Sequence, residues 1–354
     1  MTDAGRARGA SAAVRRLSES ATPDFLLPIE TAPMEARSAA LLPDEPGAWL
    51  YEPKWDGFRC LAFKDGSEVD LRAKSGKPLG RYFPEMLSAL RSLPARRFVI
   101  DGELVIETDG QRSFDSLQMR LHPAQSRIAR LAAETPAKYV LFDILATAAD
   151  RKLVDRPLEK RRAALEAFVS KTDGSDAVLL SPATRSIEEA LVWLKQAGQG
   201  ATDGVVAKPL SGIYEPGVRS MIKVKRLRTA DCVVGGFRYS STSRQVASLL
   251  LGLYNEAGKL DHVGFTSSIP KSERAALTKR LEKLRASPGF TGKAPGAPSR
   301  WTTARNSEWE PLRNEVVVEV RFDHVTGRRF RHGAAFVRWR PEKSPRQCTF
   351  DQIE

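Results

Sequence analysis

The apolar residues of the first half fall into short runs that predict β-strands joined by tight turns. Residues 49–51 form one such run, and 60–63 and 68–72 form two more. The last two flank Asp65-Gly66, a dipeptide that favours a tight hairpin turn. Residues 138–145, K-Y-V-L-F-D-I-L, are the clearest buried strand of this half because their apolar run is interrupted only once, by an acid.

Helical spacing of apolar residues alternates with these strands, so the pattern predicts an α+β protein. Apolar residues recur on one helical face after F-P-E at 83–85. A helix is also predicted within 111–133, over 158–168 and over 186–196. Ser186 is the expected N-cap of the last helix, with Glu189 at the capping-box position.

Acidic residues interrupt three of the predicted strands, which is costly in a protein interior unless the carboxylates are paired or bind something. Residues 97–106, R-F-V-I-D-G-E-L-V-I, hold two carboxylates around a glycine, and a surface hairpin turn at D-G is the alternative. Asp143 interrupts the run at 138–145 and needs an explanation. Residues 202–208, T-D-G-V-V-A-K, again place an acid and a glycine before an apolar pair.

The next strand, M-I-K-V-K at 221–225, directs two lysines to one side. Met221, Lys223 and Lys225 share a face because side chains alternate along a strand. Like charges on one face repel, so an anion between them would be stabilising. An exposed edge strand protected by lysines is the alternative.

Short β-rich segments dominate the chain after Ala230, with one predicted helix over 270–284. This spacing is typical of a small Greek-key barrel of the OB type. We therefore predict a domain over 23–225, built from antiparallel sheets with helices, followed by an OB-fold domain over 226–354. Residues 1–22, rich in Ala, Arg and Ser, are expected to be a disordered tail; an organellar transit peptide is the alternative.

Composition and charge narrow the class of protein. The chain has 354 residues, enough for about two domains, and no apolar run near the roughly 20 residues that span a bilayer. Its net charge is +13, and the residues from Met221 onward hold 25 lysines and arginines against 13 acids. This asymmetry favours a polyanion-binding module beside a balanced catalytic one, with a solubilising basic surface as the alternative. Three separated cysteines indicate a reducing compartment and no zinc site.

A lysine in unusual surroundings is the first candidate for chemistry. Lys54 lies within E-P-K-W-D-G-F-R at 52–59, between aromatic neighbours and close to an acid, a glycine and an arginine. A lysine is a nucleophile only as the free amine, which requires an environment that favours proton loss. The alternative is a strand-end lysine whose stem packs on Trp55.

Six motifs in order resemble those of the covalent nucleotidyltransferases, specifically the ATP-dependent DNA ligases. They are K-W-D-G-F-R at 54–59, D-G-E at 101–103, F-D at 142–143, D-G-V-V-A-K at 203–208, I-K-V-K at 222–225 and R-W-R-P-E-K at 338–343. The surrounding sequence is most similar to compact bacterial ligases related to the ligase module of the end-joining system, over about 25–354. The resemblance implies an ATP-grasp-like nucleotidyltransferase domain followed by an OB fold.

The resemblance also implies roles for individual residues. Lys54 would attack the α-phosphate of ATP and carry AMP. Glu52 would read the adenine amino group and Phe142 would stack on the ring, while Arg59 and Glu103 would hold the ribose. The phosphates would be neutralised by three lysines, Lys208, Lys223 and Lys225, and contacted from the C-terminal motif by Arg338, Arg340 and Lys343.

Metal and DNA contacts follow from the same resemblance. Glu103 and Asp203 would hold Mg²⁺ or Mn²⁺ against phosphate oxygens. Asp203 stands where most relatives have Glu, and A-K-S-G replaces a frequent S-R-N-G, so the nick-phosphate contact falls on Lys74 or on Arg72. Glu342 occupies a position where many ligases have Asp.

The expected activity is therefore the sealing of nicks in duplex DNA, in DNA repair. An RNA ligase or a capping guanylyltransferase shares the lysine chemistry, and a non-enzymatic OB-fold nucleic-acid binder is a further alternative. We expect a monomer in the bacterial cytoplasm, associated with the nucleoid and not with a membrane. Since no DNA-encircling domain is evident, weak binding to plain duplex, strong salt sensitivity and reliance on DNA-repair partner proteins are also expected.

Overall fold

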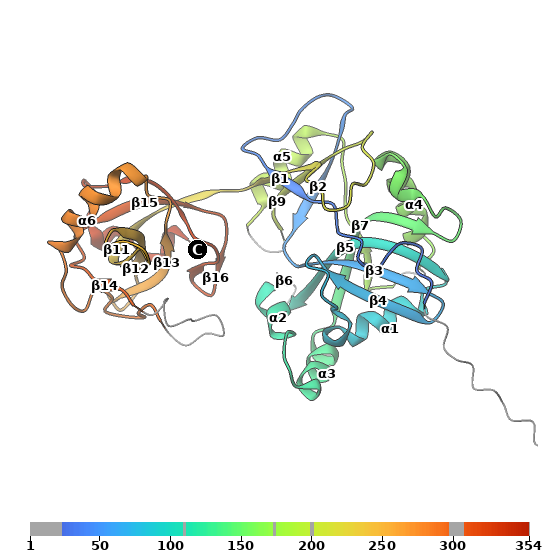
Figure 1. Cartoon of the computed structure of the whole chain (residues 1–354), viewed down its shortest axis with the longest axis horizontal. Helices are drawn as coiled ribbons and strands as arrows, with labels where there is room; N and C mark the ends of the chain where they lie inside the picture. The colour runs from blue at the N-terminus through green and yellow to red at the C-terminus, as the bar shows by residue number, and fades with distance from the viewer. Residues whose placement is uncertain (1–22, 109–110, 173–174, 199–201, 297–307, 354) are drawn as a thin grey trace, which may run out of the picture.

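The computed structural model describes residues 23–108, 111–172, 175–198, 202–296 and 308–353. The predicted tail over 1–22 lies outside these residues. Figure 1 shows two units joined by a short segment between β10 and β11, a larger one coloured blue to yellow and a smaller one coloured orange to red. Within the described residues, no helix is both long and apolar enough to cross a bilayer.

The first sheet of the larger unit has the strand order β4-β3-β5-β7-β8, with β6 paired to β5. Its strands are β3 (Phe58–Asp65), β4 (Glu68–Ala73), β5 (Arg97–Thr108), β6 (Gln111–Arg112), β7 (Ala137–Thr147) and β8 (Val178–Leu180). Asp65 pairs with Glu68 at the end of the β3–β4 ladder, so the predicted hairpin is confirmed. The predicted buried strand is β7, in which nine of the eleven residues are buried.

The segment around D-G-E is one continuous strand, so the alternative of a surface turn is wrong. β5 pairs with β3 on one side and with β7 on the other across the whole motif. A Cβ atom on Gly102 would lie 2.5 Å from the carbonyl oxygen of Val140 and 2.6 Å from the ring of Tyr139. The glycine therefore allows the close approach of β7, rather than a reversal of the chain.

The second sheet has the order β1-β10-β9-β2, and its strands are β1 (Ala36–Ser38), β2 (Trp49–Trp55), β9 (Thr202–Pro209) and β10 (Met221–Lys225). β2 is longer than the predicted run at 49–51 and carries Lys54 within the strand. Lys54 pairs with Gly204 of β9, which pairs in turn with Lys225 of β10. This register brings three of the predicted motifs side by side.

Helices cover the two sheets. They are α1 (Pro84–Ser92), α2 (Phe114–Met119), α3 (Gln125–Glu134), α4 (Leu158–Val169) and α5 (Ile187–Gln196). The helix expected within 111–133 is two helices, because the chain turns between Met119 and Gln125. The predicted N-cap of α5 is confirmed, since Ser186 Oγ accepts a hydrogen bond from the Glu189 amide at 3.2 Å.

The smaller unit is a six-stranded sheet with the order β13-β12-β11-β15-β18, and β14 paired to β11. Its strands are β11 (Arg228–Tyr239), β12 (Val246–Tyr254), β13 (Leu260–Thr266), β14 (Glu310–Pro311), β15 (Val317–Phe322) and β18 (Ala335–Trp339), with α6 (Arg274–Glu282) between β13 and β14. A small hairpin, β16 (Val325–Thr326) and β17 (Arg329–Phe330), follows β15. The core holds buried residues from β11, β12, β13 and β15.

The ends of this sheet approach one another without forming a ladder. Across the described residues β13 and β18 are not paired, although the Ala334 amide donates to the carbonyl of Phe265 at 2.9 Å. The predicted α+β class is confirmed, whereas a closed barrel is not observed.

Candidate active site

A cavity of about 220 Å³ lies between the two sheets of the larger unit. Eight of the predicted site residues line it: Glu52, Lys54, Arg59, Lys74, Glu103, Phe142, Lys208 and Lys223. They come from β2, β3, β5, β7, β9, β10 and the turn after β4. The fold therefore brings residues that are up to 171 positions apart in the sequence, from Glu52 to Lys223, to one cavity.

Lys54 is held by a carboxylate from the neighbouring strand. Its Nζ lies 2.9 Å from Asp203 Oδ1, and Lys225 Nζ lies 3.0 Å from Asp203 Oδ2. Asp203 is 4% exposed, and its Oδ1 makes no well-formed hydrogen bond with any described residue. A buried anionic oxygen beside the amine thus has capacity for a further cation.

Lysines crowd this end of the cavity. The pKa of Lys223 is lowered by burial and by the positive charges of Lys54, Lys225 and Lys74. Burial would also lower the pKa of Lys225, but Asp203 and Asp323 outweigh it, and the net shift is upward. An anionic ligand would stabilise lysines crowded in this way, so the anion expected beside Lys223 and Lys225 stays a prediction.

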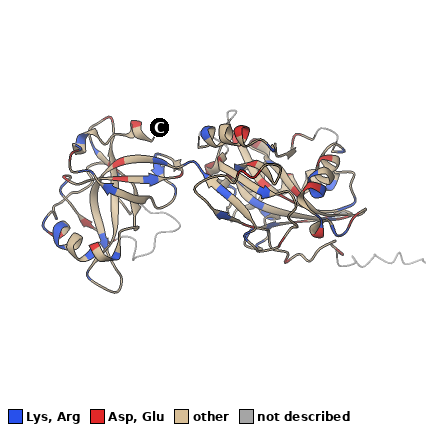
Figure 2. Cartoon of the chain, turned by 90° about the horizontal axis from the view of Figure 1, so that it is seen from above, with Lys and Arg blue, Asp and Glu red and all other residues tan. Residues whose placement is uncertain are grey.

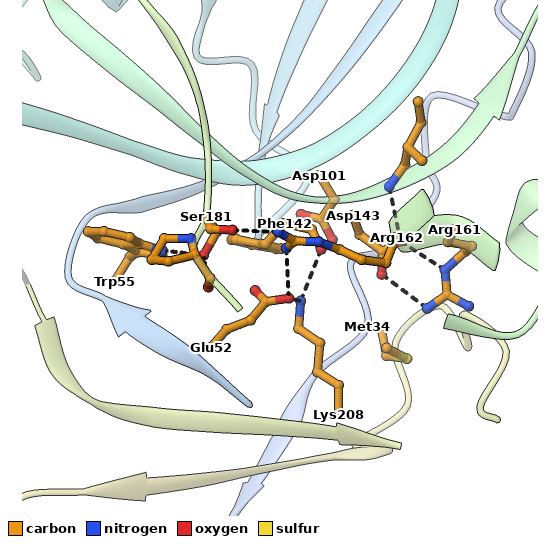
Figure 3. Close-up of polar contacts among 12 residues, drawn as sticks. Met34, Glu52, Trp55, Asp101, Phe142, Asp143, Arg161, Arg162, Ser181 and Lys208 are labelled. Atoms are coloured by element: carbon orange, nitrogen blue, oxygen red, sulfur yellow. Dashed lines mark hydrogen bonds and ion pairs between the residues drawn. The ribbon is translucent and has the colours of Figure 1, made fainter. Parts of the chain in front are cut away.

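Glu52, Phe142 and Lys208 form a second cluster, shown in Figure 3. Lys208 Nζ lies 3.0 Å from Glu52 Oε1, donates to the Phe142 carbonyl at 3.1 Å and stands 4.5 Å from the centre of the Phe142 ring. Burial raises the pKa of Glu52, and the charge of Lys208 opposes that rise. The resemblance implies that Lys208 contacts the phosphates of ATP. In this structure it lies beside Glu52, the residue expected to contact the adenine amino group.

Arg59 is fixed by a buried network. Its Nε and Nη2 each donate to a carboxylate oxygen of Asp101 at 2.6 Å, and its guanidinium lies 4.5 Å from the centre of the Phe142 ring. The Tyr214 hydroxyl donates to the same carboxylate at 2.6 Å and accepts from the Met34 amide at 2.9 Å. Nothing in the sequence marks Tyr214 as part of the site, because it is a single tyrosine in a Gly- and Pro-rich loop.

Asp143 also has a buried arginine partner. Arg161 on α4 donates to its two carboxylate oxygens at 2.8 and 3.1 Å, and both side chains are at most 2% exposed. Arg161 also donates to the carbonyls of Arg156 and Gly212. The acid in the buried strand therefore anchors α4 to the sheet and lies outside the cavity lining.

The two predicted metal ligands fit a divalent cation. Burial raises the pKa of Glu103 to about 8, although the charges of Arg59 and Lys54 oppose the rise, so a cation would stabilise its ionised form. Asp203 offers Oδ1, which pairs with Lys54 at 2.9 Å and makes no well-formed hydrogen bond with a described residue. No cluster of three or more Asp, Glu, His or Cys side chains occurs within the described ranges, but Mg²⁺ commonly needs only one or two carboxylates when substrate phosphates complete its shell.

The two candidates for the nick-phosphate contact are placed differently. Lys74 lines the cavity and pairs with Glu35 at 3.0 Å. Arg72 lies along β4, where its Nε donates to Asp70 at 2.7 Å. Lys74 is thus the one of the two that reaches the cavity.

Residues of the C-terminal motif lie in the smaller unit and pair with acids there. Arg338 Nε lies 2.7 Å from Glu319 Oε2, Arg340 Nη1 lies 2.8 Å from Asp231 Oδ1, and Lys343 Nζ lies 3.1 Å from Asp231 Oδ2. All three basic residues belong to the described part of the chain and lie outside the cavity.

The smaller unit touches the larger one beside Lys54. Arg331, just after β17, donates to Asp56 Oδ1 at 2.6 Å, and its guanidinium lies 3.3 Å from the centre of the Phe114 ring. Asp323 after β15 pairs with Lys225 at 2.7 Å. We call these contacts, made by Asp56, Phe114 and Lys225 with Asp323 and Arg331, the inter-unit contact.

Comparisons with known proteins agree with this division. The family model described as "ATP dependent DNA ligase domain" matches residues 32–225, and the one described as "ATP dependent DNA ligase C terminal region" matches 242–343. DNA ligase C1 of Mycolicibacterium smegmatis is 44% identical over 92% of this chain and 94% of its own length. DNA ligase C of Mycobacterium tuberculosis is 43% identical over 91% and 93%.

Among solved structures, a Lig E DNA ligase described as DNA binding with a minimal scaffold superimposes with a TM-score of 0.56 at 18% identity. The match covers 87% of this chain and 99% of that one. At this identity the likeness concerns the fold, and it supports the mixed α+β architecture described above.

Proposed function

Because this chain belongs to the family of ATP-dependent DNA ligases, which use ATP to seal nicks in duplex DNA, we propose which of its residues carry out that reaction. Lys54 is the nucleophile. The observation that supports this assignment is the convergence of eight predicted site residues on one cavity, with Lys54 Nζ held 2.9 Å from Asp203.

In the first step the Lys54 amine attacks the α-phosphorus of ATP. A bond forms between Nζ and the α-phosphorus, the bond from that phosphorus to the oxygen bridging to the β-phosphate breaks, pyrophosphate leaves, and Nζ releases a proton to water. Asp203 orients the amine. Lys223 and Lys225 flank the phosphates and offset the charge that moves onto pyrophosphate, which is stabilisation by fixed charges rather than by general acid catalysis.

The nucleoside is recognised at the other end of the cavity. Glu52 accepts a hydrogen bond from the adenine 6-amino group, and Phe142 packs on the base. Arg59 and Glu103 hold the ribose, with Arg59 fixed by its fork to Asp101. Lys208 pairs with Glu52 in this structure, and its ammonium can turn to the phosphates when ATP is bound because a lysine stem is flexible.

Glu103 and Asp203 are the residues that would hold Mg²⁺ or Mn²⁺. When bound, the metal supplies charge neutralisation at phosphate oxygens. Two observations support this pair as its ligands: the buried Asp203 carboxylate, whose Oδ1 makes no well-formed hydrogen bond with a described residue, and the upward-shifted pKa of Glu103.

The later steps transfer AMP to DNA and then release it. A 5′-phosphate oxygen attacks the phosphorus of lysyl-AMP, the nitrogen–phosphorus bond breaks, and Lys54 takes up a proton from water and regains its amine. The 3′-hydroxyl then attacks the activated 5′-phosphorus, AMP leaves, and the hydroxyl proton is released to water. Lys74 is the better placed contact for the nick phosphate, since it lines the cavity and Arg72 pairs along β4.

The C-terminal motif acts after a movement of the smaller unit. Its three basic residues reach ATP only if they leave their carboxylate partners, Asp231 and Glu319, and bind phosphate instead. They are Arg338, Arg340 and Lys343. We assign the domains as 23–225 and 226–354 and the second as an OB-type barrel, because the end strands approach at Ala334 and Phe265. Figure 2 places basic residues on both units, which suits a duplex held between them by a monomer in DNA repair.

The test is self-labelling with α-labelled ATP or, separately, GTP, followed by denaturing electrophoresis and a chase with nicked duplex. We expect label from ATP on the wild type and on Lys160→Met, an exposed control on α4, and none on Lys54→Ala. The nick should discharge the label as a longer strand forms. Label retained in Lys54→Ala would remove the nucleophile assignment, and label from GTP alone would favour a capping activity.

A further inference from the structure

An arginine that is outside the cavity stands directly behind the expected base-reading residue. Arg162 Nη1 on α4 lies 3.7 Å from Glu52 Oε1, and Figure 3 shows both residues beside Lys208. Glu52 Oε1 pairs with Lys208 Nζ at 3.0 Å, whereas Arg162 Nη1 is buried and makes no well-formed hydrogen bond with any residue in the described ranges. A buried, unsatisfied guanidinium nitrogen therefore faces an ion-paired carboxylate oxygen at the back of the site.

Arg162 is held rigidly in this position. Its Nε donates to Glu166 at 2.7 Å one helical turn away, and its Nη2 donates to the Ser181 carbonyl at 2.9 Å. Ser181 Oγ in turn accepts from Trp55 Nε1 at 2.9 Å, next to Lys54 in the sequence. The guanidinium is 11% exposed and has two of its three nitrogens fixed, so its third nitrogen is aimed at Glu52.

The charges around Glu52 come from four elements. Lys208 on β9 and Arg162 on α4 are cations, Asp143 on β7 is an anion paired with Arg161, and Lys54 follows two residues later on the same strand. Burial raises the pKa of Glu52; Lys208 and Arg162 oppose that rise, and Asp143 adds to it. If Lys208 turns to the phosphates of ATP, Arg162 is the cation that remains at Glu52.

We propose that Arg162 is a positioning residue for nucleotide selection, which keeps Glu52 ionised and thereby makes the site prefer a 6-amino purine over a 6-oxo purine. The proposal rests on the assignment of Glu52 to the base. A carboxylate can only accept hydrogen bonds, so it suits the adenine amino group and opposes a 6-oxo oxygen, which is also an acceptor. A protonated Glu52 would carry a donor and lose this preference.

The test compares the wild type, Arg162→Met, Arg162→Gln and Arg162→Lys with Lys160→Met, which removes a charge from the exposed side of the same helix. Self-labelling of Lys54 is measured with ATP and with inosine triphosphate from about pH 6 to 9. Thermal melting of each variant shows whether it is folded.

In Arg162→Met and Arg162→Gln we expect the KM for ATP to rise about tenfold near neutral pH, with the maximal rate of labelling within about twofold of wild type. The KM should approach the wild-type value as pH rises, because Glu52 then ionises without help. The preference for ATP over inosine triphosphate should fall about tenfold, and Arg162→Lys should restore part of both effects.

Two results would overturn the proposal. One is that folded Arg162→Met or Arg162→Gln matches Lys160→Met at every pH, both in the KM for ATP and in the preference for ATP over inosine triphosphate. The other is an equal, pH-independent loss with both nucleotides, which would mean that Arg162 only supports Ser181 and Trp55. Failure of the proposed function gives different results. If the activity were wrong, the wild type would not be labelled by ATP; if the assignment of Glu52 to the base were wrong, Glu52→Ala would leave the KM for ATP unchanged.

Discussion

Two carboxylates face each other across the ladder of β5 and β7, and each is neutralised by its own arginine. Asp101 pairs in register with Asp143, Asp101 binds Arg59, and Asp143 binds Arg161. Like charges at adjacent strand positions are destabilising unless each has a partner. One of these pairs holds Arg59 in the cavity and the other holds α4. A single step in the ladder therefore fixes both the proposed ribose contact and the helix that carries Arg162.

Tyr214 completes the Arg59 network and should affect ATP binding without touching ATP. Tyr214→Phe removes one of the two hydrogen bonds to Asp101 Oδ2, which Arg59 still contacts, and leaves the Met34 amide without its acceptor. We expect a loss of about 1–3 kcal/mol in unfolding free energy and a KM for ATP raised several-fold. Urea unfolding and self-labelling measure these. Tyr139→Phe is the matched control, because that hydroxyl donates to the Cys60 carbonyl; an equal rise in KM there would contradict a specific role for Tyr214.

Glu103 gives the apoprotein a pH-dependent stability. Its pKa is about 8 in the folded protein against an ordinary value near 4.5, so between these pH values the unfolded chain releases the proton first. The folded state is therefore most favoured by this group below about pH 4.5 and loses stability as pH rises toward 8. Glu103→Gln should remove that loss.

In metal-free buffer, the unfolding free energy of Glu103→Gln should increase relative to that of the wild type between about pH 6 and 9. Urea unfolding of both proteins at these two pH values measures the difference. Glu134→Gln, an exposed change on α3, is the control. A difference that stays constant with pH would show that Glu103 is already ionised in the folded protein.

At the scale of elements, the site depends on how closely β2, β9 and β10 pack. Gly204 of β9 is opposite Lys54 on one side and Lys225 on the other. A Cβ atom there would lie 2.1 Å from the carbonyl oxygen of Val224, which is backbone and cannot move away as a side chain could. The glycine next to Asp203 thus sets the separation of the two lysine-bearing strands.

Gly204→Ala should therefore both destabilise the protein and impair labelling. We expect an unfolding free energy lowered by about 1–3 kcal/mol or more, and a maximal labelling rate reduced at least tenfold because Asp203 moves relative to Lys54. Gly80→Ala is the comparison, since its new methyl group would meet the end of the Leu87 side chain at 3.2 Å. Normal labelling by Gly204→Ala would mean that the strands can separate without disturbing Asp203.

At the scale of the whole molecule, the inter-unit contact links movement of the smaller unit to the catalytic lysines. Arg331 neutralises Asp56, and Asp323 shares Lys225 with Asp203. The pKa of Asp323 is about 2: burial would raise it, but hydrogen bonds from Lys225 and His332 and their charges outweigh this. Because the pKa of Asp323 is depressed, its ionised carboxylate stabilises the folded protein at pH values above the ordinary pKa of an aspartate. This stabilisation is lost as pH falls toward about 2.

Arg331→Ala should loosen the two units. It removes an ion pair to Asp56 and a guanidinium stacked on Phe114, so the radius of gyration from X-ray scattering should increase in the absence of DNA. Raised salt should bring the wild type toward the variant. Arg321→Ala, an exposed change on β15, is the control and should leave the scattering unchanged. Identical scattering of Arg331→Ala and wild type would mean that other contacts hold the units together.

The local elements and the residues that carry the chemistry can be recognised in the amino-acid sequence alone. The hairpin at Asp65-Gly66, the N-cap at Ser186 and the buried run of β7 depend on neighbouring residues, and local propensity fixes such features. The motif around Lys54 and its order relative to the other motifs identified the family, since those residue types at that spacing serve one kind of phosphoryl chemistry.

Which charged side chains meet depends on the folding of the whole chain. The D-G-E segment is a central strand rather than a turn because β7 packs against Gly102, a contact that no local pattern encodes. Asp143 pairs with Arg161, Asp101 with Tyr214, and Glu52 with Lys208 and Arg162, all at long separation in the sequence. Charge pairing in a protein interior depends on distance and burial, and both are set by strand register and helix packing, so the partners became visible only in the folded chain.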